Sequence, residues 1–77
     1  MQGRILTILN VQVFIGELPS GDLKVWHPFN DRVRQLIEPI CRGKGRWHPR
    51  FNNWIVFSNF KYEVIAELDT LEKAHHG

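Results

Sequence analysis

Residues 4–16 read RILTILNVQVFIG, and this stretch decides the fold. The odd-numbered residues are apolar or β-branched, and they share one face of an extended chain because strand side chains alternate. They are Ile5, Thr7, Leu9, Val11, Val13 and Ile15. β-branched residues suit a pleated, half-buried surface. The sequence therefore predicts one long strand over residues 4–16, with Asn10 and Gln12 on its more polar face.

A turn and a second strand follow the first. Residues 19–22 read PSGD, a combination typical of turns because Pro and Gly favour the backbone angles that turns need. Leu23 to Trp26 then forms a strand. Since the connection is short, we expect the two strands to pair as an antiparallel hairpin.

The next segment has the signature of a helix. Asn30 is a favourable N-cap, and Asp31 suits the positive end of the helix dipole. One apolar stripe with helical spacing comprises Val33, Leu36, Ile37 and Ile40. We expect the helix to kink or end near Pro39, which lacks an N–H group, and to stop at Gly43 and Gly45.

A second hairpin and a second helix complete the pattern. Residues 46–51 and 54–58 are the predicted strands, and Asn52-Asn53 is the predicted two-residue turn, since Asn tolerates positive φ. Ser58 or Asn59 is then expected to cap the last helix. Its apolar face consists of Val64, Ile65, Leu68 and Leu71.

The predicted fold is a single α+β domain over residues 1–77, in the order β-β-α-β-β-α. A chain of 77 residues supports one core, and its 43% hydrophobic and 23% charged residues are ordinary for a globular domain. We expect an antiparallel sheet of about four strands with two helices packed on one face.

The cysteine content and the N-terminus bear on the compartment. Cys41 is the one cysteine, so no internal disulfide forms, and this favours a reducing, cytoplasmic setting. The apolar run after Arg4 is interrupted at Asn10 and lacks a small-residue cleavage site, so we expect no signal peptide. No stretch approaches the ~20 apolar residues that span a bilayer.

The sequence shows no catalytic or metal-binding constellation. Ser20 and Ser58 lie outside nucleophile-elbow patterns, and Cys41 follows an apolar stripe that favours its burial. Residues 43–46, GKGR, are too short for a phosphate-binding loop. Zinc-finger spacing is missing around the histidines, which are His27, His48, His75 and His76. We therefore expect no enzymatic activity, metal or cofactor.

Positive charge gathers in the middle of the chain. The net charge is only +2, but residues 42–61 hold five cations and no acid. Residues 1–41 are balanced, and residues 62–77 carry a net charge of −3. Because such a region attracts phosphates more strongly than the total charge suggests, it is a candidate binding surface.

Aromatic residues are interleaved with these cations between Arg42 and Trp54. Cations neutralise phosphates, and aromatic faces stack on unpaired bases. In the other interpretation, the tryptophans belong to the core and the cations only keep the protein soluble. Trp54 is expected in the core because it opens an apolar strand, whereas Trp47 fits either interpretation.

The same residues resemble a known module. Trp47-x-Pro49-x-x-x-x-Trp54, followed by Ile55-Val56 and preceded by a helix and a Gly-Lys-Gly-Arg link, resembles the HARP domain of annealing helicases. It is also similar to short modules in plasmid-borne antirestriction, primase and topoisomerase-type proteins. The resemblance covers roughly residues 23–71, with His48 at a position that is usually acidic. It implies an accessory role in DNA transactions.

The sequence thus favours a non-enzymatic nucleic-acid-binding module, for DNA or RNA, that contacts backbone phosphates. Its predicted contact residues are Arg42, Lys44, Arg46, Trp47, Arg50 and Lys61. The alternative is a phage or mobile-element accessory protein that binds a protein partner or forms a homodimer through the free edge of the first strand. Cations gathered on one exposed face beside an aromatic side chain favour the first hypothesis, and a large exposed apolar patch favours the second.

Overall fold

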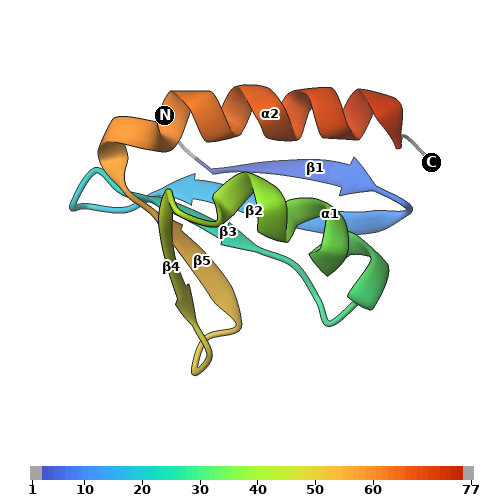
Figure 1. The fold of residues 1–77 in the computed structure, drawn as a ribbon, viewed down its shortest axis with the longest axis horizontal. Helices are drawn as coiled ribbons and strands as arrows, with labels where there is room; N and C mark the ends of the chain where they lie inside the picture. The colour runs from blue at the N-terminus through green and yellow to red at the C-terminus, as the bar shows by residue number, and fades with distance from the viewer. Residues whose placement is uncertain (1–2, 76–77) are drawn as a thin grey trace.

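The computed structural model describes residues 3–75, which form one five-stranded antiparallel sheet and two α-helices (Figure 1). Neighbouring strands lie in the order β1-β2-β3-β5-β4. Along the chain, the elements are β1 (Arg4–Ile8), β2 (Val11–Glu17), β3 (Leu23–Trp26), α1 (Asp31–Cys41), β4 (Gly45–His48), β5 (Asn53–Val56), a 3₁₀ turn η1 (Ser58–Phe60) and α2 (Lys61–Ala74). The α+β class and the antiparallel sheet are confirmed, but the predicted order and strand number are wrong.

The additional strand arises because the stretch predicted as one strand turns back on itself. Leu9 and Asn10 have φ of 52° and 63°, and two consecutive left-handed residues form the tight turn of a β-hairpin. In the resulting register Leu6 lies opposite Val13. Leu6 is therefore buried while Ile5 is 52% exposed, which reverses the predicted face of this strand.

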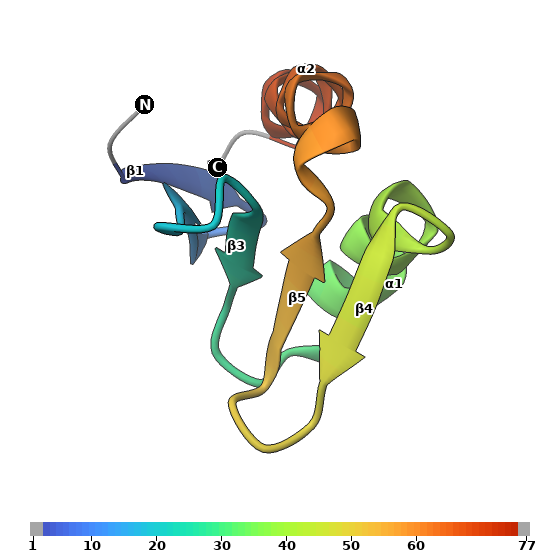
Figure 2. The same ribbon diagram turned by 90° about the vertical axis from the view of Figure 1, so that its left-hand side faces the viewer.

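One face of the sheet and the inner faces of both helices enclose the hydrophobic core. Figure 2 shows α1 and α2 together on one side of the sheet. The buried apolar side chains are Leu6, Ile8, Val13, Ile15, Leu23, Val25, Val33, Ile37, Cys41, Val56, Val64 and Leu68. Among the described residues, no helix covers the opposite face of the sheet, here called the open face.

Helix α1 begins as predicted and ends between Pro39 and Gly43, where the sequence predicted its end. The side chain of Asn30 accepts a hydrogen bond from the Val33 N–H at 3.0 Å, which confirms the N-cap. The helix continues past Pro39 to Cys41. It does not extend further, because Gly43 adopts a left-handed conformation with a φ of 79°. Cys41 is buried as predicted, and burial raises the pKa of its thiol to about 12.

The second hairpin has a longer loop than predicted. Strands β4 and β5 are joined by residues 49–52, and of the two predicted turn residues only Asn52 has a positive φ, at 53°. Asn53 instead belongs to β5, where it pairs with His48 of β4 and Trp26 of β3. The predicted two-residue turn Asn52-Asn53 is therefore wrong, and Asn53 is the first residue of β5, an interior strand of the sheet.

Helix α2 is entered through η1 rather than through a serine or asparagine cap. No side chain caps α2 at its first residue, and the Ser58 N–H donates instead to the Asp22 carboxylate at 3.0 Å. At its other end, α2 covers the edge of β1. The Thr7 N–H donates to the Glu72 carboxylate at 2.6 Å, and the Leu9 N–H donates to the His75 carbonyl at 3.0 Å.

Gly45 permits the close approach of β4 to β5. A Cβ atom at this position would lie 2.2 Å from the carbonyl oxygen of Ile55 and 2.7 Å from the Cα of Val56. Both neighbours are backbone atoms, so relief requires the two strands to separate. Gly16 in β2 differs, because its Cβ would be 3.7 Å from the nearest atom.

We expect Gly45→Ala to lower the free energy of unfolding by about 2 kcal/mol or more, as overpacking does. Gly16→Ala is the matched control, with an expected change of about 0.5 kcal/mol or less. Urea denaturation followed by tryptophan fluorescence measures both variants. Equal midpoints for the two would contradict the close packing of β4 on β5.

Candidate functional site

The open face carries two parallel rows of side chains. Directly opposed residues of antiparallel strands lie on the same face of a sheet. Lys24, Ile55 and Arg46 are opposed across β3, β5 and β4 and form one row. The other row consists of Phe14, Trp26, Asn53 and His48, across β2, β3, β5 and β4. A row of cations around an apolar residue therefore runs beside a row rich in aromatic rings.

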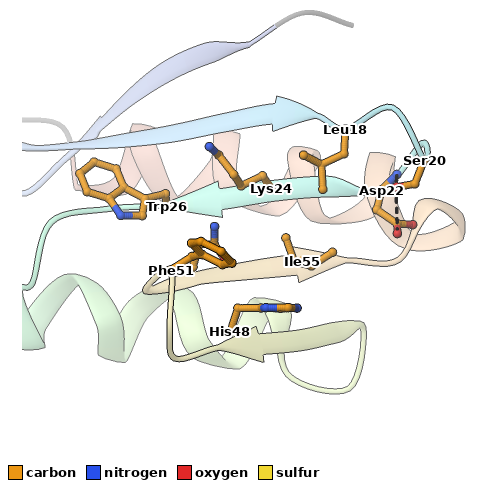
Figure 3. Close-up of a pocket in the computed structure, with 9 residues that line it drawn as sticks. Leu18, Ser20, Asp22, Lys24, Trp26, His48, Phe51 and Ile55 are labelled. Atoms are coloured by element: carbon orange, nitrogen blue, oxygen red, sulfur yellow. Dashed lines mark hydrogen bonds between the residues drawn. The ribbon is translucent and has the colours of Figure 1, made fainter.

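A groove of about 650 Å³ crosses this face. Figure 3 shows Lys24 and Trp26 projecting from β3, Ile55 from β5 and His48 from β4, with Phe51 beside β5. The remaining wall comes from the β2–β3 turn, and the complete lining is Leu18, Ser20, Asp22, Lys24, Trp26, His48, Phe51, Asn53 and Ile55. A hollow of about 370 Å³ continues on the β1 side of Lys24.

The aromatic rings form two pairs on either side of Asn53. The rings of Phe14 and Trp26 have centroids 5.4 Å apart, and those of His48 and Phe51 are 6.3 Å apart. The guanidinium of Arg50 lies 5.8 Å from the centre of the Phe51 ring. Phe51 is 61% exposed, so its ring is accessible to a planar ligand.

Lys24 is the one cation among the described residues that line the groove, and Arg46 and Arg50 lie beside it. Lys24, Arg46 and Arg50 make no ion pair with any carboxylate in the described part of the chain. Asp22 is the one acid among the described lining residues. Its two oxygens already accept hydrogen bonds from the Ser58 N–H and the Ser20 hydroxyl, at 3.0 and 3.2 Å. The three cations are therefore available to an anionic ligand.

The structure divides the basic segment that the sequence singled out. Arg46 lies on the open face, and Arg50 lies in the loop beside it. Arg42 pairs with Glu38 along α1, although its side chain is 72% exposed. Lys44 contacts α2, where the carboxylates of Glu63 and Glu67 lie 2.7 and 2.9 Å from its ammonium. The segment that is continuous in sequence thus supplies cations to both sides of the sheet.

The two tryptophans of the predicted motif lie on the helix side. Trp47 and Trp54 are directly opposed, with ring centroids 5.6 Å apart in an edge-to-face arrangement. Trp54 packs against the hydrophobic core, as predicted. Trp47 borders a separate hollow of about 330 Å³ with Arg42 and Glu38 of the α1 side. Trp47 therefore does not share a surface with Arg46.

Lys61 lies in an ion pair at the start of α2. Its side chain is 10% exposed, and its ammonium donates to the Glu17 carboxylate at 2.5 Å and to the Gly21 carbonyl at 3.2 Å. The hydrogen bond and charge of Lys61 lower the pKa of Glu17 below its ordinary value of 4.5. The hydrogen bond to Glu17 raises the pKa of Lys61 above 10.5, against the effect of burial. This lysine ties α2 to the β2–β3 hairpin.

The most prominent residues of the groove were missed from the sequence. Lys24 and Trp26 alternate with the core residues Leu23 and Val25, so a period-two pattern was sufficient to place them together on the other face. Phe14 sits in the same way between two core residues of β2. In each case, a large aromatic residue on the solvent side of a predicted strand was the sequence signal that could have indicated a binding surface.

The described residues were also compared with the arrangement that a metal ion needs. Within residues 3–75, no group of three or more His, Cys, Asp or Glu side chains is placed to hold a metal ion. His76 lies outside the described residues. No helix in the described range is long and apolar enough to cross a membrane.

No family model, curated protein or solved structure matches this chain.

The Lys61–Glu17 pair predicts a pH dependence of stability. Because the pKa of Glu17 is lowered by folding, its contribution is present above pH 4.5 and is lost as the pH falls through the folded-state pKa. We expect Lys61→Met to reduce this component, because Lys61 is the largest cause of the lowered pKa of Glu17, so that stability falls less steeply between pH 5 and about pH 3. Urea midpoints at several pH values measure the slopes.

Lys73→Met is the control, because Lys73 is exposed on α2 and makes no ion pair with a described residue. It should keep the slope of the unmodified protein. Parallel curves for the unmodified protein and both variants would show that the Glu17 carboxylate does not depend on Lys61.

Proposed function

We propose that this protein is a non-enzymatic nucleic-acid-binding module that uses the open face of its sheet. The observation that carries the proposal is the row in which Lys24 and Arg46 flank Ile55 without a carboxylate partner among the described residues. Beside that row lie accessible aromatic rings. Cations for phosphates next to aromatic surfaces for bases are the two components of binding to nucleic-acid strands.

The resemblance to the HARP-like modules agrees with this class of function. Of the residues first predicted to make contacts, Arg46 of the cationic row and Arg50 beside the exposed Phe51 ring are assigned to the proposed interface. Arg42 pairs with Glu38 on the helix side and therefore lies outside the proposed interface. Lys44 and Lys61 are held by carboxylates, so they are assigned a structural role.

The electrostatic part of the proposed binding is largely independent of the nucleotide sequence of the ligand. Phosphate contacts position a nucleic acid without identifying its bases. Helix α1 presents Arg34, but that guanidinium is engaged by Asp31 and Glu38 on the same helix. The sheet, rather than a recognition helix, is therefore the proposed contact surface.

Self-association through the same face is the second candidate function. Ile5 and Phe14 are exposed and line one hollow, which is the apolar character that an interface needs. A two-fold dimer, however, brings a patch against its own copy. Lys24 and Arg46 would then approach the same charges of the partner without a compensating acid in the row, which disfavours this arrangement.

We expect labelled 20-nucleotide DNA to bind with a log–log salt slope of about −2, which corresponds to three phosphate contacts on a single strand. Lys24→Glu/Arg46→Glu should weaken binding by about 100-fold at about 20 mM salt, because two contacts are lost and reversed. Fluorescence anisotropy at several salt concentrations measures both values.

The matched control is Arg32→Glu/Lys73→Glu, which changes the net charge equally on exposed residues of the two helices. It should retain most of the affinity. Equal losses in the two double variants would point to a general charge effect, and no binding at low salt by the unmodified protein would reject the proposal. Sedimentation would then test for the dimer.

A further inference from the structure

The side chain of Asn53 has unused hydrogen-bonding capacity. Asn53 is only 6% exposed, and its side-chain oxygen Oδ1 is buried without a hydrogen-bond partner in the described protein. Buried polar atoms in folded proteins almost always have a partner, so an unpaired one requires an explanation. No other buried side-chain nitrogen or oxygen among the described residues is left in this state.

Asn53 is the first residue of β5, an interior strand, and lies at the end of the open face nearest the β4–β5 loop. It lies on β5, directly between Trp26 of β3 and His48 of β4. All three side chains line the groove of about 650 Å³, together with Phe51 from the loop that precedes β5. The unpaired amide is therefore surrounded by aromatic rings, with Lys24 and Arg46 in the adjacent row.

The chemistry of this arrangement specifies its ligand. The unpaired oxygen requires an N–H or O–H donor. Rotation about the last side-chain bond lets the amide present either its acceptor or its donor, because this torsion is broad. Flat rings on both sides select a planar heteroaromatic group with both donors and acceptors on its edge. A nucleobase has these properties, and the neighbouring cations suit the phosphates attached to it.

We propose that the groove binds one unpaired base of a single-stranded nucleic acid, with its edge hydrogen-bonded to Asn53. This inference rests on the proposed function and defines its substrate class. The base stacks against Trp26 on one side and the His48–Phe51 pair on the other. Lys24 and Arg46 contact the phosphates that flank it.

A double helix does not meet these requirements. In a duplex, the base edges that pair are already hydrogen-bonded and the base faces are stacked on each other. Insertion of a base into the groove would require unpairing and unstacking, which costs a few kcal/mol and thus a large factor in affinity. The proposal therefore predicts a preference for single strands at equal phosphate number.

The experiment compares three labelled 10-nucleotide ligands at one salt concentration: oligo(dT), an abasic strand with the same sugar-phosphate backbone, and a duplex. We expect oligo(dT) to bind the unmodified protein about 10- to 100-fold more tightly than the abasic strand. Asn53→Leu should reduce this preference by about 10-fold while leaving the affinity for the abasic strand unchanged. Fluorescence anisotropy gives each dissociation constant.

Leucine is chosen because it fills a similar volume and removes the unpaired amide, so the variant should unfold at an equal or higher urea concentration. Loss of base preference in an equally stable protein separates ligand contact from a structural role. Arg32→Glu/Lys73→Glu, the control defined above, should keep the preference for oligo(dT) over the abasic strand.

Each outcome has a distinct meaning. If the unmodified protein binds none of the three ligands, the proposed function fails, and this inference fails with it. Equal binding of oligo(dT) and the abasic strand would leave phosphate binding intact and overturn the base pocket. An unchanged base preference in Asn53→Leu would likewise overturn the role of Asn53.

Discussion

The register between β1 and β2 is the constraint on which the other features of the structure depend. The left-handed turn at Leu9 and Asn10 places Ile8 opposite Val11, and every later pair of the hairpin follows from it. A slip of one residue would exchange the two faces of β1. In the observed register, Leu6 lies beside Val13 in the core, and Ile5 and Phe14 are left on the open face.

The distribution of charge follows from the same two-layer arrangement. Both helices lie on one side, and the acids of α2 reach cations on that side, as Glu63 and Glu67 do for Lys44. Lys61, at the start of the same helix, is neutralised by Glu17 of β2. The open face has no comparable source of carboxylates among the described residues, so Lys24 and Arg46 stay unpaired there. A small net charge of +2 therefore conceals a locally positive surface.

Local patterns were sufficient to predict the start and the inner face of α1, but not the turns. The cap at Asn30, the stripe of α1 and the burial of Cys41 depend on neighbours within a few residues. The turn at Leu9 was missed because leucine rarely adopts a positive φ, and the adjacent Asn10 was the one local sign of a turn within an otherwise alternating stretch. The role of Lys61 was missed for another reason. Its partner is 44 residues away, and only the fold brings them together.

The candidate site was predicted in its chemistry and only partly in its position. Charge density along the chain drew attention to residues 42–61, but alternation along a strand sends neighbouring residues to opposite faces. Arg46 and Trp47 are therefore separated by the sheet, although they are adjacent in sequence. Lys24 and Arg46 are far apart in sequence and share one row. A surface that crosses strands is visible only after the strand order is known.

In the proposed binding mode, the unpaired amide of Asn53 is the feature that favours an unpaired base over phosphate alone. A buried polar atom without a partner has already lost its water in the free protein, at a cost of about 1–3 kcal/mol to stability. In the proposed mode, the side-chain amide turns toward the groove, and a ligand supplies the missing donor. The backbone of Asn53 is already paired with β3 and β4, so the strands keep their arrangement on binding. The free-energy cost of the unpaired amide in the free protein is thereby recovered on binding a ligand whose edge carries a hydrogen-bond donor.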